Sequence, residues 1–525
     1  MPRIIVGLGG LLSDAGCCVI KDGELASAVE QSKVGRRERH GQFAEEAFVT
    51  ALATAHVQPE EIDCLAVARP FARGPESDAH FALRSRVPNA EIVVVEHHTA
   101  HAASAYFASG FSHAKVLSVD RAGDFRSAAL FEAAGTQMTP VREMYFPDSL
   151  GDLFARVTQL LGYEPRSDEH KVQWLSATGR PLYKELFMSV LGREGSAWPG
   201  IDRAYLDGSR LAHGGFSGRF FEEMGLLPGQ TIGPSKQADI AASLQEAINE
   251  AVGRMALPAE NLCIAGGLAL NALLIASLER RCSNVFVQPA AGNAGTAIGA
   301  ALYAWHTRFG QRQRIPFDNL YLGPEYSAEQ IKKVLENCKL RFNFLLTEGE
   351  LIAQALKSLG EDKIVAWMHG RMEFGPRALG NRSLLASPLN RYSTENLNVF
   401  IKHRESSRKF AASVPAELAS EYFEVGPNAR FLATVGRVRD QHRNTFQAAL
   451  LNSDSIRVHT VDRTANPLYH SLLVAAGKST GLPVLYNTSF NLFGDPLVCT
   501  PRDAVRSFYS SGVDAMFAGN FFLEK

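Results

Sequence analysis

The chain has 525 residues, of which 46% are hydrophobic and 21% charged, and its formal net charge is −1. This length and composition are those of an ordinary globular protein with roughly two to four domains. A net charge near zero gives no overall field that would attract nucleic acid or an acidic membrane, so we predict neither as a partner. Any anion-binding site must therefore come from a local concentration of arginine.

The cysteines and the amino terminus indicate the compartment. Seven cysteines are scattered along the chain without a C-x-x-C pair, and an odd number of such residues is typical of a reducing environment. The first residues lack the basic, apolar and cleavage regions of a signal peptide. No apolar run approaches the roughly 20 residues that span a bilayer. We therefore predict a cytoplasmic protein without a membrane partner.

The chain opens with a pattern of short strands. Residues 3–8 predict a buried strand before Gly9 and Gly10, and strands at 17–20 and 24–29 flank the turn Lys21-Asp22-Gly23. A helix follows at about 43–55. This order resembles the opening of the actin-like ATPase fold, in which the first hairpin holds phosphate with backbone groups.

Two histidines follow the next predicted strands, at 64–67 and 92–95. His97 and His101 are four residues apart in an alanine-rich segment, so a helix would place both imidazoles on one face as half of a divalent metal site. The strand at 115–119 ends in Asp120, which could supply another ligand. Asn293, just before a later helix, could add a side-chain oxygen. The alternatives are incidental histidines at a polar helix start and an Asp120 that caps a turn.

A longer region separates these motifs. Lys171 lies in the polar segment SDEHKVQWLSAT, where phosphate contact and simple solvation both remain open. Residues 196–230 are glycine-rich, and we expect an irregular excursion over the cleft that, with Trp174, carries specificity for the acceptor.

Gly266 and Gly267 follow a predicted strand at 262–264 and lead through Asn271 into a helix. Glycines between a strand and a helix amino terminus can seat phosphate or adenosine, although they also permit close packing of helix on strand. With a strand at 285–287 and a helix at 296–306, this region repeats the strand–glycine–helix order of the first half. Such a duplication is expected of the actin-like ATPase fold.

The second half begins after a segment at 307–322 that is rich in Arg, Gln, Pro and Gly. We place a domain boundary near Pro316, which gives domains at 1–315 and 316–525. Helices at 327–338 and 348–359 and a strand at 364–368 predict an α/β domain.

The segment GRMEFGPRALGNRS, residues 370–383, holds Arg371, Arg377 and Arg382 among glycines; we call it the arginine loop. A second basic run, IKHRESSRKF at 401–410, contains Lys402, Arg404 and Arg408. Guanidinium forks bind phosphate and carboxylate oxygens in pairs, and glycine lets backbone N–H groups approach the same oxygens. We therefore predict a cradle for a small, highly charged anion. The alternative is a solvated basic face, which the apolar residues of the loop disfavour.

Two later segments could serve the same anion or its neighbour. Arg457 opens a predicted strand at 457–461. A strand at 483–486 leads into NTSFN, where Asn487, Ser489 and Asn491 suit recognition of an amide or a ribose. They suit an Asx-turn equally well.

The arginine loop, IKHRE and NTSFN, in that order, resemble the carboxy-terminal half of the O-carbamoyltransferases, which include nodulation-factor, tobramycin and hydroxymethylcephem carbamoyltransferases. HHTAHAASAYF, AGGLALN and PAAGNAGTAIGAAL resemble that family's amino-terminal domain. The resemblance implies an α/β protein with two parts. These are an actin-like ATPase domain, similar to threonylcarbamoyl-transfer proteins, and a carboxy-terminal YrdC-like domain that forms carbamoyladenylate.

The same resemblance implies the reaction. ATP, with Mg²⁺, and carbamoyl phosphate would yield carbamoyladenylate, and the carbamoyl group would pass to a hydroxyl of a small natural product. His97, His101 and Asp120 match the family's iron ligands, so Fe²⁺ is the expected metal. Asn293 stands where the family usually has an aspartate. Ser13-Asp14 replaces a His-Asp pair, which leaves Asp14 as a candidate base.

The resemblance and the residue patterns described above together give the full set of candidate site residues. Asp14, His97, His101 and Arg377 are the expected catalytic residues. The expected cofactor-binding residues are Lys171, Gly266, Gly267, Asn271, Arg371, Arg382, Lys402, Arg404, Arg408, Arg457, Asn487, Ser489 and Asn491.

Two other functions compete with this prediction. A sugar kinase of the actin-like class would explain the first half but leave the arginine loop unused. A non-catalytic metal- or nucleotide-binding member of the family is favoured by the changes at Ser13 and Asn293. The identity of the acceptor and the oligomeric state, with a homodimer as one expectation, stay open.

Overall fold

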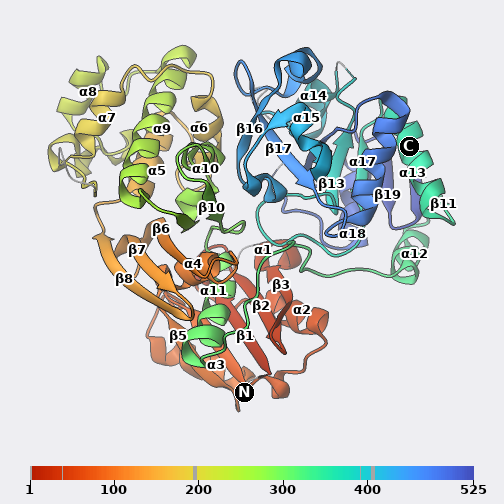
Figure 1. The fold of residues 1–525 in the computed structure, drawn as a ribbon, viewed down its shortest axis with the longest axis horizontal. Helices are drawn as coiled ribbons and strands as arrows, with labels where there is room; N and C mark the ends of the chain where they lie inside the picture. Colours follow the sequence, from red (N-terminus) through yellow and green to blue (C-terminus); the bar gives the residue numbers. More distant parts are fainter. Residues whose placement is uncertain (1–2, 38–39, 193–197, 391, 404–407, 493) are drawn as a thin grey trace.

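The computed structural model describes residues 3–37, 40–192, 198–390, 392–403, 408–492 and 494–525. Figure 1 shows three lobes, two from the first half of the chain and one from the second half. Each lobe contains one β-sheet. No helix among these residues is long and apolar enough to cross a membrane.

The first lobe holds a five-stranded sheet in the order β3-β2-β1-β4-β5. β1 pairs antiparallel with β2 and parallel with β4. The strands are β1 (Ile4–Gly9), β2 (Gly16–Lys21), β3 (Glu24–Glu30), β4 (Cys64–Ala68) and β5 (Glu91–Val95). The helices are α1 (Gln31–Gly35), α2 (Glu45–Ala55) and α3 (Glu76–Arg86).

The second lobe repeats this plan, with its strands in the order β8-β7-β6-β9-β10. β6 pairs antiparallel with β7 and parallel with β9, as β1 does with β2 and β4. The strands are β6 (His113–Gly123), β7 (Arg126–Ala134), β8 (Gln137–Tyr145), β9 (Asn261–Ala265) and β10 (Asn284–Val287). The predicted duplication is therefore confirmed in strand order and direction, and with it the actin-like ATPase fold.

Two helices, α4 (His97–Tyr106) and α11 (Gly295–Tyr303), pack between the two sheets. Small residues make this possible. A Cβ on Gly299 would lie 1.8 Å from the carbonyl oxygen of Ala100, and one on Gly7 would lie 2.1 Å from that of Ala297. Because α4 is fixed from both sides, its histidines are held in one position.

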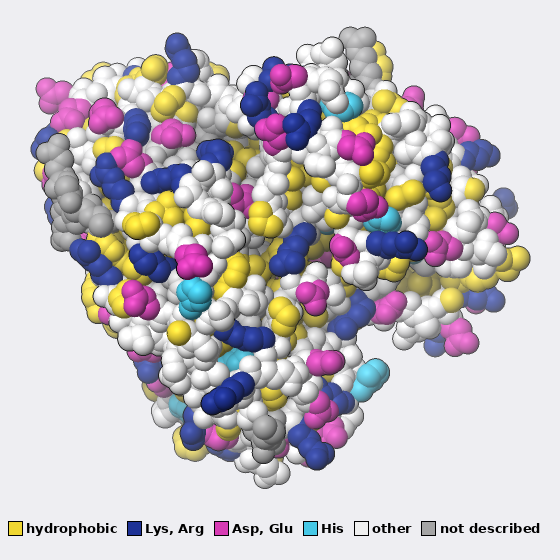
Figure 2. All heavy atoms as spheres, viewed as in Figure 1, with side chains coloured by type: hydrophobic (Ala, Val, Ile, Leu, Met, Phe, Trp, Pro, Cys, Tyr) yellow, Lys and Arg dark blue, Asp and Glu magenta, His cyan; other side chains and the backbone are white. Residues whose placement is uncertain are grey.

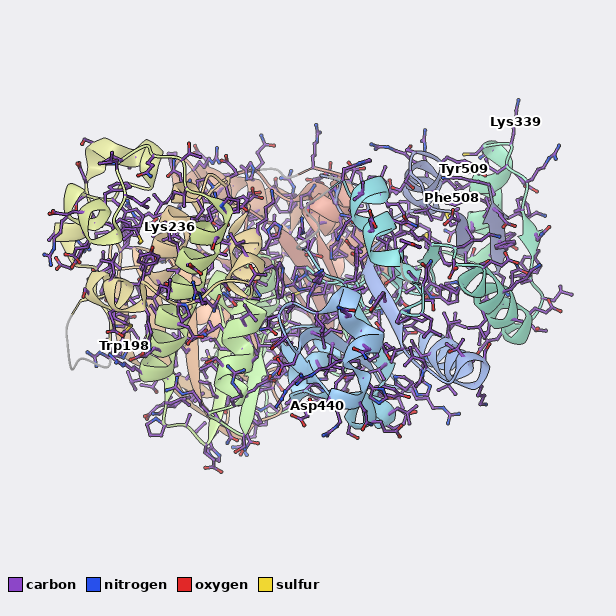
Figure 3. The ribbon with its side chains drawn as sticks, turned by 90° about the horizontal axis from the view of Figure 1, so that it is seen from above. Trp198, Lys236, Lys339, Asp440, Phe508 and Tyr509 are labelled. Atoms are coloured by element: carbon purple, nitrogen blue, oxygen red, sulfur yellow. The ribbon has the colours of Figure 1, made fainter. Side chains whose placement is uncertain are left out.

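A helical region covers the second sheet. Its helices are α5 (Leu150–Leu160), α6 (Glu169–Ser176), α7 (Lys184–Val190), α8 (Gly218–Met224), α9 (Pro234–Ala256) and α10 (Ala272–Glu279). The predicted irregular backbone occurs at 198–217, which holds only short 3-10 turns, but the prediction of a surface excursion is wrong for the described residues. Phe216, Phe220 and Phe221 are buried in this core, and Figure 3 shows Trp198 at the outer end of the molecule. Burial of these large aromatic side chains draws the segment inward despite its glycines.

The third lobe is built on a ten-stranded mixed sheet, in the order β11-β20-β19-β12-β13-β18-β14-β17-β16-β15. Its strands are β11 (Asn343–Phe344), β12 (Val365–Met368), β13 (Arg382–Ala386), β14 (Ala411–Pro415), β15 (Phe423–Glu424), β16 (Val435–Val438), β17 (Ser455–Val461), β18 (Leu485–Ser489), β19 (Ala515–Ala518) and β20 (Phe521–Glu524). The helices are α12 (Ala328–Asn337), α13 (Glu348–Gly360), α14 (Ser393–Asn396), α15 (Ala419–Tyr422), α16 (Arg443–Phe446), α17 (Pro467–Thr480) and α18 (Pro501–Tyr509). The α/β class is confirmed.

The arginine loop is attached to the first lobe. Lys33 of α1 donates to the carbonyl oxygen of Glu373 at 3.0 Å, and Glu30 accepts from the backbone N–H of Gly375 at 3.1 Å. Lys33 and Glu30 also form an ion pair, and both are buried. The two halves of the chain are thus joined at the loop that carries the arginines.

Candidate active site

Two histidines and one carboxylate meet at the amino-terminal end of α4. Nε2 of His97 lies 2.8 Å from Oδ2 of Asp120, and Nε2 of His101 lies 3.3 Å from the same oxygen. One ligand atom from each residue falls within 4.8 Å of the others. The backbone N–H of His97 donates to Asp124 at 2.9 Å, which fixes the start of the helix against the end of β6. The four-residue spacing therefore does place both rings on one face.

The electrostatics of this group suit a metal ion. Burial by itself would raise the pKa of Asp120, but His101 and His97 outweigh it and hold that pKa well below its usual range. Burial lowers the pKa of His101, which favours the neutral ring that ligates metals. Both ring nitrogens of His101 are buried without a hydrogen bond of normal geometry. An unsatisfied imidazole beside an ionised carboxylate fits the two-histidine, one-carboxylate donor set of divalent metals.

The edge of this group carries three further residues. Asn293 lies beside His101 and donates Nδ2–H to Oγ of Ser13 at 2.9 Å. Oδ2 of Asp14 accepts from the backbone N–H of Ala294 at 3.4 Å. Ser13 is exposed and Asn293 is half-buried, so this edge opens to solvent. The predicted base and the predicted fourth ligand therefore lie on the same side of the centre.

The glycine motif after β9 lies on the other side of Asp120. Gly266 has φ +95° and a Cβ there would lie 2.2 Å from the carbonyl oxygen of Val119, which supports the close-packing alternative. A Cβ on Gly267 would lie 2.9 Å from Oδ1 of Asp120, so this position keeps space beside the carboxylate. Asn271 caps α10 by accepting from the N–H groups of Leu273 and Leu274. Nucleotide binding by this motif stays a prediction.

A second group, the basic cluster, contains Arg377, Arg408 and His170. Burial and then Arg408 lower the pKa of Arg377 to about 10. Burial lowers the pKa of His170 to about 4, and Arg408 and Arg377 contribute to the shift. His170 belongs to α6 of the first half, whereas both arginines belong to the second. The cluster therefore spans the junction of the two halves.

Neighbouring contacts extend this junction. Arg377 donates to the carbonyl oxygen of Leu270, in the glycine motif of the first half, at 3.2 Å. The guanidinium of Arg457 lies over the ring of Trp174 at 5.0 Å. Lys171, next to His170, donates to Asp168 at 3.0 Å. The predicted Arg404 lies outside the described residues. Figure 2 shows a notch in the surface between the two upper lobes.

Two arginines of the loop have a different position. Arg382 is completely buried, opens β13, and donates to the carbonyl oxygens of His369, Gly370, Asn381 and Pro324. These carbonyls occupy both terminal nitrogens of its guanidinium, which supports a structural role, and its predicted contact with an anion stays a prediction. Arg371 donates to the carbonyl oxygens of Gly323, Leu322 and Ala26, which ties the loop to the linker and to β3. Neither contact is with the basic cluster.

The NTSFN motif is held by Lys402. Its Nζ donates to the carbonyl oxygens of Ser489 and Asn491 and, at 2.7 Å, to Oδ1 of Asn491. Asn487 donates to the carbonyl oxygen of Ala378 in the arginine loop, while its Oδ1 is buried without a partner. The strand before the motif was predicted to end at residue 486, whereas β18 continues to Ser489 and so includes the first three residues of NTSFN. Asn487 thus supports the arginine loop directly, and Lys402 fixes the backbone of the motif that carries Asn487.

Sequence reasoning missed two residues of these sites. The sequence pattern did not single out His170, which lies next to Lys171. A histidine between Asp-Glu and Lys is only a weak indication of a binding site. Glu373 is completely buried and accepts from the backbone N–H groups of Leu379, Asn381 and Arg382, so it folds the arginine loop around one carboxylate. From the sequence alone, a glutamate between glycines and arginines could equally form an ion pair at the surface, so its buried role could not be predicted.

Two protein-family models match the chain. The carbamoyltransferase N-terminus matches residues 81–302, and the carbamoyltransferase C-terminus matches residues 356–525. This chain belongs to the carbamoyltransferase family. The predicted resemblance is thereby confirmed, and the chain is an enzyme of carbamoyl transfer.

Several proteins are similar to this chain, and one of them is named as a carbamoyltransferase. An uncharacterized protein of Synechocystis sp. is 32% identical over 99% of this chain and 96% of its own length. The nodulation protein NolNO of Sinorhizobium fredii is 30% identical over 98% of this chain and 79% of its own length. The 3'-hydroxymethylcephem-O-carbamoyltransferase of Amycolatopsis lactamdurans is 32% identical over 54% of both chains.

Proposed function

We propose that this carbamoyltransferase uses ATP and carbamoyl phosphate to make carbamoyladenylate and then carbamoylates a hydroxyl of a small natural product. Carbamoyl phosphate loses phosphate to water to give carbamate, whose oxygen attacks the α-phosphorus of ATP and displaces pyrophosphate. The acceptor hydroxyl then attacks the carbamoyl carbon and displaces AMP. The two half-reactions belong to the two sites described above.

The observation that carries this proposal is the basic cluster at the junction of the two halves. Arg377 and Arg408 lie close enough for one to lower the pKa of the other, and both act on His170 of the opposite half. Like charges held together are stabilised when an anion binds between them. ATP and carbamoyl phosphate bring several negative charges, and preorganised guanidinium groups offset their mutual repulsion. Mg²⁺ would accompany ATP.

The histidine group suits the second half-reaction. His97, His101, Asp120 and Asn293 would hold the metal, which we propose to be Fe²⁺ and which would supply Lewis acidity at a bound oxygen. Asp14 lies on the open edge of this group, where an acceptor hydroxyl would enter, and would remove its proton. Placing both sites in one chain keeps a hydrolysable anhydride away from bulk water.

Two variants test this division of labour. We expect Arg377→Ala to abolish release of pyrophosphate from ATP in the presence of carbamoyl phosphate, with unchanged metal content. We expect His101→Ala to lose metal and acceptor carbamoylation but to keep pyrophosphate release. Both quantities are measured on both variants, with mass spectrometry of candidate acceptors for a gain of one carbamoyl unit. If both variants lose the same step, the proposed division is wrong.

The products also separate the alternatives. A kinase would release ADP, and a non-catalytic member would release neither ADP nor pyrophosphate when carbamoyl phosphate is present. AMP and pyrophosphate in equal amounts are the result expected of the proposed reaction.

A further inference from the structure

One face of α6 meets the second half of the chain, on the side of its lobe next to β16 (Figure 1). His170 and Trp174 are four residues apart in this helix, so their side chains share a face. Trp174 is buried against Leu451, and the guanidinium of Arg457 lies 5.0 Å from its ring. Because both of these partners belong to the second half, His170 faces the junction of the two halves.

Arg377 reaches the same place from the arginine loop. It donates to the carbonyl oxygen of Leu270 at 3.2 Å, and Ala272, two residues further along, packs against Trp174. Arg377 therefore contacts the first half close to the helical face that carries His170. Burial, and after it the two arginines of the basic cluster, lowers the pKa of His170, in agreement with this placement.

The hydrogen bonding of His170 fixes which of its ring nitrogens can accept. Nδ1 lies 3.0 Å from the carbonyl oxygen of Ser167, and a carbonyl oxygen can only accept, so Nδ1 carries the proton. The neutral ring then presents Nε2 as an acceptor, on a side chain that is only half-buried. Arginine side chains, in contrast, carry donors only. His170 thus adds an acceptor to a cluster whose other two members can only donate.

We propose that Nε2 of His170 accepts a hydrogen bond from the NH₂ group of carbamoyl phosphate and so selects the carbamoyl group over other acyl groups. The inference rests on the proposed function, because that function places carbamoyl phosphate at the basic cluster. The phosphate and carbonyl oxygens of this substrate accept from Arg377 and Arg408, whereas its NH₂ group donates and needs an acceptor. Acetyl phosphate offers the same oxygens with a methyl group in place of NH₂. It displaces water from Nε2 without replacing the hydrogen bond, which weakens its binding.

The test compares two phosphonates that bind without reacting. Phosphonoacetamide keeps the NH₂ group of carbamoyl phosphate, and acetonylphosphonate has a methyl group in its place. Calorimetric titration of the full-length chain should show about tenfold tighter binding of phosphonoacetamide, as one hydrogen bond to an otherwise unpaired group gives. In His170→Ala, we expect phosphonoacetamide to bind as weakly as acetonylphosphonate, whose own affinity should change by less than about twofold.

Two further variants complete the experiment. His170→Gln carries an oxygen that can accept near the position of Nε2, so it should restore part of the preference. His113→Ala is the matched control, since that exposed histidine pairs with Glu260 at the start of β6, and it should keep the full preference.

Three results would overturn the role of His170 while leaving the proposed function intact. These are equal binding of the two phosphonates by the unaltered protein, an unchanged preference in His170→Ala, and an equal loss of affinity for both phosphonates in that variant. Binding of neither phosphonate by the unaltered protein would overturn the proposed anion site, and the inference with it.

Discussion

At the scale of single residues, arginines of the arginine loop have two different roles: one supports the fold, and another lies where a ligand could bind. Arg382 is enclosed by four backbone carbonyls, whereas Arg377 lies at the junction with Arg408 and has one such contact. Carbonyl oxygens and phosphate oxygens satisfy a guanidinium in the same way. The residue pattern of the loop therefore predicted where arginines gather, but it could not tell which of them face a ligand.

Substitution distinguishes the two uses. Arg382→Gln leaves several buried carbonyls without a donor, so we expect a loss of about 2–4 kcal/mol in stability and a lower midpoint of thermal unfolding. Arg377→Gln removes the donor to one carbonyl oxygen, so it should lower the midpoint less than Arg382→Gln does, while it weakens ATP-dependent activity. Calorimetry and pyrophosphate release on the two variants give the comparison. A stable Arg382→Gln protein would contradict the structural role.

At the scale of elements, the sequence predicted the strands and helices around the histidines well. The helix at 97–106, the strand that carries Asp120 and the strand–glycine–helix unit at 261–279 all occur, although β6 continues past Asp120 to Gly123. These elements have strong local signals, such as apolar runs, glycines and alanines. The local hairpin of β7 and β8 was missed, although its strands follow one another in the sequence. The aromatic core around Phe216 was missed because its residues pack against elements that lie far along the chain. Non-local packing leaves little trace in a local pattern.

The contact of α4 with α11 leads to a prediction at this scale. Gly299→Ala places a methyl group 1.8 Å from the carbonyl oxygen of Ala100, one residue before His101. The helices must separate, so we expect a loss of at least about 1–3 kcal/mol and a lower metal content. Gly360→Ala, at the end of α13, meets nothing within 4 Å and should be neutral or slightly stabilising. Thermal unfolding and metal analysis of both variants decide. Equal behaviour of the two would show that α4 is not fixed by this contact.

At the scale of the whole molecule, the first lobe fixes the arginine loop, which contributes Arg377 to the junction of the two halves. Glu30 and Lys33 come from β3 and α1, yet their partners are the backbone of Glu373 and Gly375. Arg36, just after α1, adds bonds to the carbonyl oxygens of Pro496 and Leu497. The basic cluster thus depends on contacts that lie in neither candidate site.

The last prediction follows from that dependence. Lys33→Met removes the cation from a buried pair and leaves Glu30 uncompensated, so we expect a loss of about 3–5 kcal/mol. Because the arginine loop loses its attachment to the first lobe, pyrophosphate release should fall although Lys33 touches no substrate, and metal content should stay unchanged. Lys332→Met, on the exposed face of α12, is the matched control, since its ion pair with Glu336 is solvated and worth little. Full activity in Lys33→Met would mean that the second half builds the basic cluster by itself, whereas a loss of metal would mean that the substitution disturbs the first half as a whole.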